Sequence, residues 1–293
     1  MSVGVVGPGR VGAVLAAALA SAGTRVTGWS GRESTRPAAA MPLSSRLALA
    51  DLVAASDVLL IAVSDDQIPK VVEDLAGLKP QRLPSGRRRI AWHLSGRFGV
   101  GVLAPLAAAG LWSAVAAAPA MTFTGEPTDL RRLPGSRWAV TGDDDGLVLA
   151  LHEVGDLIAR LGGVTVPVEE ADRTVLHTAL SLGSNHLGTL QRAAAALLRG
   201  IGIADPTAFL RPLAQAALAD AWDVEPRFTG PVSRGDSAVV SEHLRAIRGV
   251  DDGLTARLYA AVTQATTAQA LAAGVLSPDQ ADAIVSATAG EDR

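Results

Sequence analysis

Three glycines near the start of the chain have a spacing that suits phosphate binding. Gly7, Gly9 and Gly12 form the pattern G-x-G-x-x-G, after the apolar run "SVGVV" and before the helical pattern "RVGAVLAAALASAG". A strand, a glycine turn and a helix in this order offer free backbone N–H groups and a positive helix end to a pyrophosphate. The pattern predicts a dinucleotide site formed by Gly7, Pro8, Gly9, Arg10, Val11 and Gly12.

The end of the next predicted strand, "TRVTGWS", indicates which dinucleotide binds. NAD sites usually place Asp or Glu there to hold the ribose 2′-hydroxyl. This chain has Ser30 and Arg32 instead, and a hydroxyl with a guanidinium suits a 2′-phosphate. We therefore predict NADP(H), with Arg10 as a second cation. A salt bridge between Arg32 and Glu33 is the structural alternative for that arginine, and a deazaflavin is the alternative cofactor.

Polar residues follow the other predicted strands of the first half. "SDVLLIAVSDDQI" and "RRRIAWHLSG" each read as a buried strand with a polar end. Ligands of open parallel sheets bind beyond the carboxyl ends of the strands, so Ser64, His93 and Ser95 are candidate site residues. Further strands are predicted in "GLWSAVAAAPAMTF", "SRWAVTG" and "VTVPV", the last closing the sheet near residue 168. Asp143 to Asp145 are interpreted as helix N-terminal charge, and no metal site is predicted.

The second half of the chain has a helical pattern. From Glu169 onward apolar residues recur every three or four positions. Asp205 with Pro206 suits one helix start, and Ser277 with Gln280 forms a capping-box pattern at another. We therefore predict an α/β Rossmann domain with a mostly parallel sheet over residues 1–168 and an all-helical domain over residues 169–293.

Three polar residues recur every four positions in the first helical stretch. His177, Ser181 and Asn185 share one face of an unbroken α-helix. His177 is the first candidate for a proton donor, because the ordinary pKa of histidine lies near neutrality. A structural hydrogen bond is the alternative role for His177, and His93 is the competing acid.

The segment "TGPVSRGD" interrupts the helices between Thr229 and Asp236. Arg234 could clamp a carboxylate or reach a cofactor phosphate, and Asp236 is expected to cap the next helix and to hold Arg234. Thr229, Arg234 and Ser95 are therefore the candidate substrate-binding residues. A helix connector with a structural Arg–Asp pair is the alternative.

Composition limits the class of protein. The 293 residues carry a net charge of −3 and no cysteine, which argues against a general nucleic-acid binder and excludes disulfides and thiolate chemistry. No apolar run is long enough to span a membrane, and no signal peptide precedes the first strand, so a cytoplasmic protein is expected. The only lysines are Lys70 and Lys79, both in the first half.

Several stretches in order resemble a bacterial oxidoreductase family with a Rossmann-like domain followed by a DUF2520 domain. They are "GVVGPGRVG", "IAVSDDQI", "HLSG", "PAMTFTG", "LHTALSLGSNHL" and "TGPVSRGD". That family is similar to ketopantoate reductases, β-hydroxyacid dehydrogenases and pyrroline-5-carboxylate reductases. The resemblance implies an NADP-linked reductase, a helical domain of the 6-phosphogluconate dehydrogenase C-terminal type, and a homodimer.

The resemblance also implies roles for individual residues. Asn185 matches the family pattern and is expected to bind the substrate carbonyl or carboxylate, whereas Ser181 stands where related dehydrogenases have lysine. Three positions depart from the usual family residues: Ala118 for His, Leu176 for Tyr and Asp220 for Asn.

The expected activity is reduction of a small anionic 2-oxo acid, with ketopantoate to pantoate ranked first. The alternatives are imine reduction of the pyrroline-5-carboxylate type, and a non-catalytic NADPH-binding sensor or scaffold.

Overall fold

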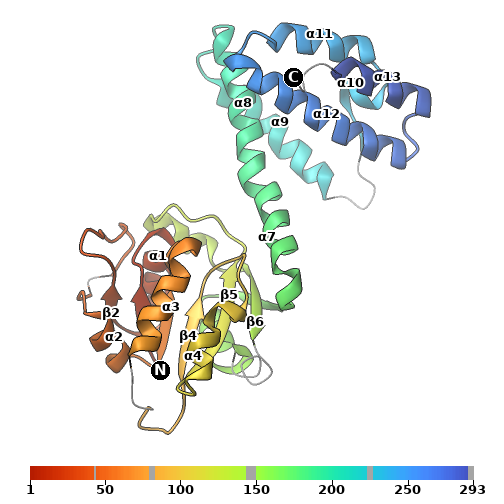
Figure 1. The fold of residues 1–293 in the computed structure, drawn as a ribbon. Helices are drawn as coiled ribbons and strands as arrows, with labels where there is room; N and C mark the ends of the chain where they lie inside the picture. Colours follow the sequence, from red (N-terminus) through yellow and green to blue (C-terminus); the bar gives the residue numbers. More distant parts are fainter. Residues whose placement is uncertain (43, 79–82, 143–149, 223–226, 290–293) are drawn as a thin grey trace. The chain divides into compact units, whose positions relative to one another are not determined.

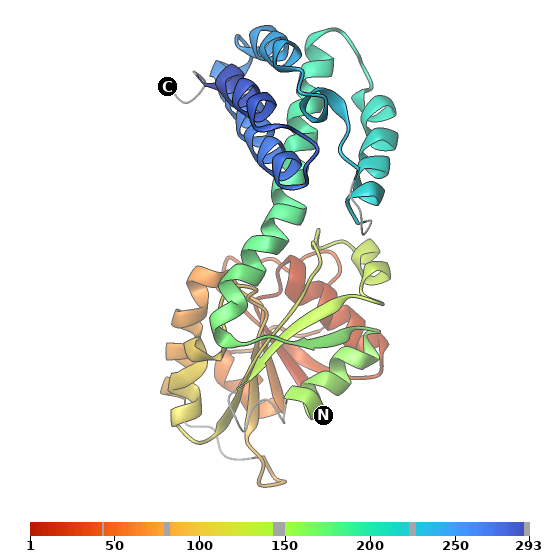
Figure 2. The same cartoon turned by 90° about the vertical axis from the view of Figure 1, so that its right-hand side faces the viewer.

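The computed structural model describes residues 1–42, 44–78, 83–142, 150–222 and 227–289. Lys79 and Asp143 to Asp145 lie outside these residues. The chain separates into two compact units, Met1–Gly183 and Ser184–Arg293. In Figures 1 and 2 the first unit is an α/β structure and the second is helical. Each is described by itself.

A seven-stranded sheet forms the middle of the described part of the first unit, in the order β2-β1-β3-β4-β5-β6-β7. Neighbouring strands are parallel except β5 and β6, which are antiparallel. The predicted mostly parallel sheet is confirmed. The strands are β1 (Ser2–Val6), β2 (Arg25–Ser30), β3 (Val58–Ile61), β4 (Arg89–His93), β5 (Trp112–Pro119), β6 (Arg137–Gly142) and β7 (Val164–Pro167).

Helices cover both faces of this sheet, as Figure 2 shows. One apolar core joins the sheet to α1 (Arg10–Ser21) and α6 (Gly155–Arg160), and a second joins it to α2 (Leu49–Ala55), α3 (Ile68–Gly77) and α4 (Ala104–Ala108). Side chains alternate between the cores along a strand: Leu60 belongs to the first, and Leu59 and Ile61 to the second. Burial on both faces explains why these strands read as continuous apolar runs.

Helix α7 (Arg173–Ser181) belongs to the first unit, together with the 3₁₀ turn η5 (Glu170–Asp172). The sequence pattern predicts both in the helical domain, with a boundary after residue 168. The physical reason for the difference is that α7 begins with Arg173, a fully buried side chain that bonds to the α/β structure.

The described part of the second unit consists of helices. They are α8 (Leu187–Gly200), α9 (Pro206–Ala221), α10 (Gly230–Ser233), α11 (Ser237–Ile247), α12 (Leu254–Ala272) and α13 (Pro278–Thr288), preceded by the end of the π-helical turn η6 (Leu182–His186). Its core lies among α11, α12 and α13, with Val240, Ala260 and Ile284 buried. Both predicted helix starts are confirmed: Asp205 accepts from the Thr207 N–H at 3.0 Å, and Ser277 and Gln280 form a capping box.

Helix length and polarity bear on membrane association. None of the helices in the described ranges is both long and apolar enough to cross a bilayer.

Candidate functional site

The glycine turn lies at the point where the strand order reverses. β1 has β2 on one side and β3 on the other, so the turn after β1 opens at a switch point of the sheet. The Gly7 N–H donates to the Ser30 carbonyl at 2.9 Å, which ties the turn to the end of β2. The Ala62 N–H donates to the Val6 carbonyl at 2.8 Å, which ties it to the end of β3.

The three glycines meet different physical demands. Gly7 has a φ of +92°, which a residue with a side chain rarely adopts. A Cβ on Gly12 would lie 2.2 Å from the Gly7 carbonyl oxygen, so α1 packs on the turn too closely for any side chain. A Cβ on Gly9 would meet nothing within 4 Å. The space beside Gly9 is therefore open to a ligand, in contrast to the packed space beside Gly12.

The start of α1 suits an anion. Gly9 is its N-cap residue and provides no side-chain cap, and the first turn holds no acidic residue. The free N–H groups and the positive end of the helix dipole therefore face no competing carboxylate from this turn. Together with the open space at Gly9, these residues fit the pyrophosphate of a dinucleotide.

The end of β2 carries basic side chains. Ser30 is buried and Arg32 is exposed. Arg46 also lies here: its guanidinium donates to the Gly31 carbonyl at 3.1 Å and stands 5.9 Å from the centre of the Trp29 ring. A cavity of about 410 Å³ adjoins this end of the sheet, lined by Trp29, Pro37, Ala38, Met41, Pro42, Ser44 and Ser45. The sequence pattern did not single out Arg46, because its place beside Gly31 depends on a short parallel bridge to Trp29.

The segment after β5 closes the other side of the glycine turn. A Cβ on Gly125 would lie 2.9 Å from Cγ of Arg10, and the Gly125 carbonyl accepts from the Ala40 N–H at 3.1 Å. Ala38 in turn donates to the Pro8 carbonyl at 3.0 Å. Three segments far apart in sequence therefore converge at the predicted cofactor site.

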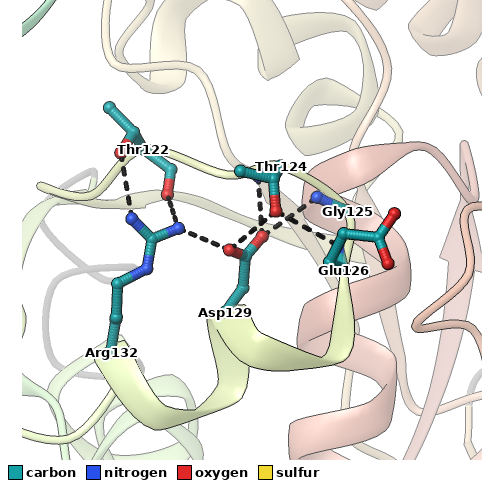
Figure 3. A network of polar contacts seen from close by, with 6 residues as sticks. All are labelled: Thr122, Thr124, Gly125, Glu126, Asp129 and Arg132. Atoms are coloured by element: carbon teal, nitrogen blue, oxygen red, sulfur yellow. Dashed lines mark hydrogen bonds and ion pairs between the residues drawn. The ribbon is translucent and has the colours of Figure 1, made fainter. Parts of the chain in front are cut away.

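A buried carboxylate holds this segment in place (Figure 3). Asp129 is 1% exposed and accepts from the Thr124 N–H at 2.7 Å, the Thr124 hydroxyl at 2.9 Å and the Gly125 N–H at 2.9 Å. It also pairs with Arg132, which donates to the Thr122 carbonyl at 2.8 Å. Burial by itself would raise the pKa of Asp129, but the hydrogen bonds from Gly125, Arg132 and Thr124 outweigh it and hold that pKa below its ordinary value.

His93, at the end of β4, has both ring nitrogens engaged. Its side chain is fully buried; Nε2 lies 2.8 Å from the Gly99 carbonyl, and Nδ1 accepts from the Ser95 N–H at 3.2 Å. Burial lowers the pKa of His93 to about 4, and the nearby Arg173 also lowers it. Such a ring is neutral and enclosed, so this environment favours a structural role over that of the competing acid.

The two predicted serines of the strand ends also make local bonds. The Ser95 hydroxyl accepts from the Arg97 N–H at 3.1 Å and the Phe98 N–H at 3.0 Å, which shapes the turn after β4. Ser64, after β3, is exposed, and its carbonyl accepts from the Gln67 N–H at 2.9 Å. Ser64 is accessible to a ligand at this edge, whereas Ser95 is buried.

His177 lies against the turn after β4. Its Nδ1 is 2.8 Å from the position that a Cβ would take on Gly96, and its side chain is exposed. Gly96 follows Ser95, so this contact brings a solvent-accessible imidazole to the carboxyl edge of the sheet. The predicted candidate His177 and the predicted strand-end turn therefore come together within the first unit.

The other predicted residues of the polar helix face lie on a different helical geometry. Ser181 ends α7, and Asn185 lies within the π-helical turn η6 that follows it. A π-helical turn shifts the phase of the side chains, so the shared face expected of an unbroken α-helix is not kept through Asn185. Asn185 is exposed, and its carbonyl accepts from the Thr189 hydroxyl at 3.2 Å. Lys70, on α3, pairs with Asp74 at 2.9 Å.

The "TGPVSRGD" segment, which the sequence pattern indicates as an interruption between helices, contains the short helix α10. Nε of Arg234 donates to Asp236 at 2.9 Å, as expected. Asp236 occupies the N-cap position of α11 but its side chain makes no capping bond, because it is turned to Arg234. Thr229 lines a cavity of about 720 Å³ within the second unit, together with the ion pair of Asp220 and Arg227.

No cluster of three or more His, Cys, Asp or Glu side chains that could hold a metal ion occurs in the part of the chain that the structure describes.

The fold and the glycine turn define a dinucleotide-binding α/β protein with a helical second region. Residues 1–117 match the model of the Rossmann-like domain, and residues 136–266 match DUF2520, a domain of unknown function. The chain therefore combines the Rossmann-like and DUF2520 domains, and the resemblance seen in its motifs is confirmed. No curated protein matches the chain in sequence.

Solved structures share the two-part fold. BF3122 of Bacteroides fragilis, a protein assigned as an NADP oxidoreductase, has 18% identity and a TM-score of 0.69, with 90% of this chain and 97% of that chain covered. A reductive aminase of Aspergillus terreus has 20% identity and a TM-score of 0.63, covering 97% and 98%. Pyrroline carboxylate reductase of Plasmodium falciparum, solved with NADP bound, has 12% identity and a TM-score of 0.57, covering 99% and 98%. At identities this low, the TM-scores show a likeness of fold alone.

Proposed function

We propose that this protein is an NADPH-dependent reductase of a small substrate with a C=N bond. The observation that carries the proposal is the place of His177 beside Gly96, after β4. The adenosine half of a dinucleotide binds over β2, so the nicotinamide half extends over β3 and β4 on the other side of β1. The ends of β1 and β4 are separated by two strand spacings, or about 10 Å.

Different residues of the first unit would bind the cofactor and supply the proton. Gly9 and the start of α1 would bind the pyrophosphate, and Arg32 with Arg46 would hold the 2′-phosphate. NADPH supplies a hydride, which adds to the carbon of the C=N bond, while a proton adds to nitrogen to give an amine and NADP⁺. His177 would supply that proton from its exposed imidazole.

Reduction of an imine suits the residues that the chain has. A protonated imine accepts hydride without a strong donor to a developing alkoxide, and Ser181 stands where a lysine would serve as that donor. The pyrroline carboxylate reductase, imine reductases and reductive aminases that share this fold support the same class of substrate. Reduction of 2-oxo acids, ketopantoate included, stays a prediction, as do the anionic substrate, the cytoplasmic location and the roles of Asn185, Arg234 and Thr229.

The test is NADPH oxidation by the purified protein with a panel of cyclic imines, ketone and amine pairs, and 2-oxo acids. We expect turnover with at least one C=N substrate, and a large loss of kcat in His177→Gln with little change in NADPH affinity. His152→Gln, a change at another exposed histidine of the same unit, is the matched control. Turnover of 2-oxo acids alone would overturn the imine assignment, and tight NADPH binding with no turnover would favour a sensor.

We also propose a homodimer formed through the second unit. α8 has no buried residue, and α9 has only Pro206. Phe209 and Leu213, four residues apart on α9, are 62% and 68% exposed, and Trp222 is 82% exposed. An apolar helix face of this kind is typical of a protein–protein interface.

A further inference from the structure

A buried arginine lies one helical turn before His177. Arg173 opens α7 and is fully enclosed, although it carries a charge. Its Nη2 donates to the Ser95 carbonyl at 2.7 Å, and its Nη1 donates to the Thr141 hydroxyl at 2.9 Å. A buried cation is stable only where hydrogen bonds compensate for its lost hydration, so these two bonds fix the position of the Arg173 guanidinium.

The bonds of Arg173 and the contact of His177 reach consecutive residues of one turn. Arg173 bonds to Ser95, and His177 lies against Gly96. Residues four apart on an α-helix stand one above the other on the same face. Two successive helical turns of α7 therefore pack on the loop after β4. The Arg173 guanidinium fixes the first of these helical turns, and the second one carries the imidazole of His177.

Glu170 strengthens this docking from the other end. Its Oε2 accepts from the Val100 N–H at 2.8 Å, and its Oε1 accepts from the Gly101 N–H at 3.2 Å. Gly99, just before, accepts the bond from His93. Arg173 of α7 thus holds the start of the turn after β4, at Ser95, and Glu170 of η5 holds its end, at Val100 and Gly101. Between them, the Ser95 hydroxyl accepts from the N–H groups of Arg97 and Phe98.

We propose that Arg173 is a positioning residue for the proposed reaction: it docks α7 on the turn after β4 and so sets the imidazole of His177 at the edge where the nicotinamide would lie. This rests on the proposed function for its catalytic consequence. The placement of His177 by Arg173 can be measured whether or not a substrate is turned over.

The experiment compares Arg173→Met with two other changes in the first unit. Thr141→Val removes one acceptor of the guanidinium and keeps the side-chain size. Leu157→Ala, in the apolar core on α6, destabilises the same unit and removes none of the hydrogen bonds of Arg173. The chain has five histidines, and the His177 ring signals in NMR spectra of isotope-labelled protein are assigned by their loss in His177→Gln.

We expect Arg173→Met and Thr141→Val to shift the His177 ring signals, and Leu157→Ala to leave them in place. We also expect Arg173→Met to lower kcat by about ten- to a hundredfold with NADPH affinity nearly unchanged, because small displacements of a reacting group have effects of this size. Gly96→Ala, whose new methyl group would push the ring, should shift the same signals even if Arg173→Met does not fold.

Two outcomes would overturn the proposal. One is an unchanged His177 signal in the folded Arg173 or Thr141 variant. Another is an equal shift in Leu157→Ala, which would mean that the ring reports only general stability. Shifted signals in a protein that turns over no substrate would keep the positioning role of Arg173 and refute the proposed function alone.

Discussion

Ser95 and His93 fix each other at the end of β4. The Ser95 N–H donates to Nδ1 of His93 at 3.2 Å, so the proton of the neutral ring resides on Nε2 and is donated to the Gly99 carbonyl at 2.8 Å. The strand end is thereby locked in one conformation by a ring that must stay uncharged. This relationship has a direct consequence for stability.

The stability of the fold should depend on pH through His93. Its pKa falls from the ordinary 6.5 to about 4 in the folded protein, mainly because of burial. The unfolded chain therefore takes up this proton at a higher pH than the folded chain does. The contribution is complete above pH 6.5 and is lost as the pH falls toward 4, with a total loss of at most about 3 kcal/mol.

Urea unfolding at a series of pH values across this window would measure the effect. His93→Gln should be less stable at neutral pH but should show a flatter dependence on pH. His152→Gln, at an exposed position, should retain the wild-type slope. If the unfolding free energy of His93→Gln changes with pH as steeply as that of the wild type, groups other than His93 cause the pH dependence.

Alanine substitutions at two glycines of the same turn should have different effects, one on stability and the other on cofactor binding. Gly12→Ala places a methyl group 2.2 Å from the Gly7 carbonyl, so we expect a stability loss of about 1–3 kcal/mol or more. Gly9→Ala meets no protein atom within 4 Å and should leave the melting temperature unchanged. It should nevertheless weaken NADPH binding by about tenfold, because the methyl group would occupy the approach of the pyrophosphate. Thermal unfolding would measure the effect on stability, and fluorescence titration with NADPH the effect on binding. Unchanged NADPH affinity in Gly9→Ala would contradict the proposed pyrophosphate site at Gly9.

Arg32→Ala should cost about 1.5–3 kcal/mol of NADPH affinity and little NADH affinity, since the proposed charged hydrogen bond would go to the 2′-phosphate, which NADH lacks. Arg46→Ala should act in the same direction, because Arg46 bonds to Gly31 at the same end of β2. Arg25→Ala is the control, at the opposite end of that strand. Titration of each variant with NADPH and with NADH would measure both affinities. Equal losses for NADPH and NADH would remove the reason for preferring NADP.

Asp129→Asn should destabilise the segment that closes the glycine turn. The amide keeps one acceptor oxygen but loses the charge that Arg132 and the N–H groups of Thr124 and Gly125 require, at a cost of about 1–3 kcal/mol. NADPH affinity should fall as well, because Gly125 packs on Arg10. Asp156→Asn, on the exposed side of α6, should change neither quantity. The idea fails if NADPH binds to Asp129→Asn as it does to the wild type.

The proposed dimer predicts a mass near twice 29.9 kDa by light scattering at micromolar concentration. A double change of Phe209 and Leu213 to Glu should give monomers, because it places charge on the exposed apolar face of α9. Val164→Glu, at an exposed apolar residue on β7, should leave the mass unchanged. A wild-type mass of a single chain would refute the dimer.

Much of this protein follows from local sequence patterns. The glycine turn, the parallel strands and the helix starts at Asp205 and Ser277 could be predicted because each depends on neighbouring residues: on backbone freedom at Gly7, on runs of apolar side chains, and on a side chain that reaches its own helix end. The place of the turn after β4 at the ligand-binding edge could also be predicted, since all strands of a parallel sheet share one carboxyl edge.

Only the tertiary structure decided which polar residues at that edge are buried and bonded within the fold and which are exposed to a ligand. The sequence offers both His177 and His93 as candidate proton donors, yet in the structure His93 is enclosed with both ring nitrogens bonded, and His177 is exposed beside Gly96. Arg173 reads as a surface residue of a helix, and its burial depends on bonds to Ser95 and Thr141, 78 and 32 positions away in the chain. Burial and long-range hydrogen bonds are set by the packing of distant segments, which no local pattern contains. The cooperation of Arg173 with His177 is therefore a property of the folded chain.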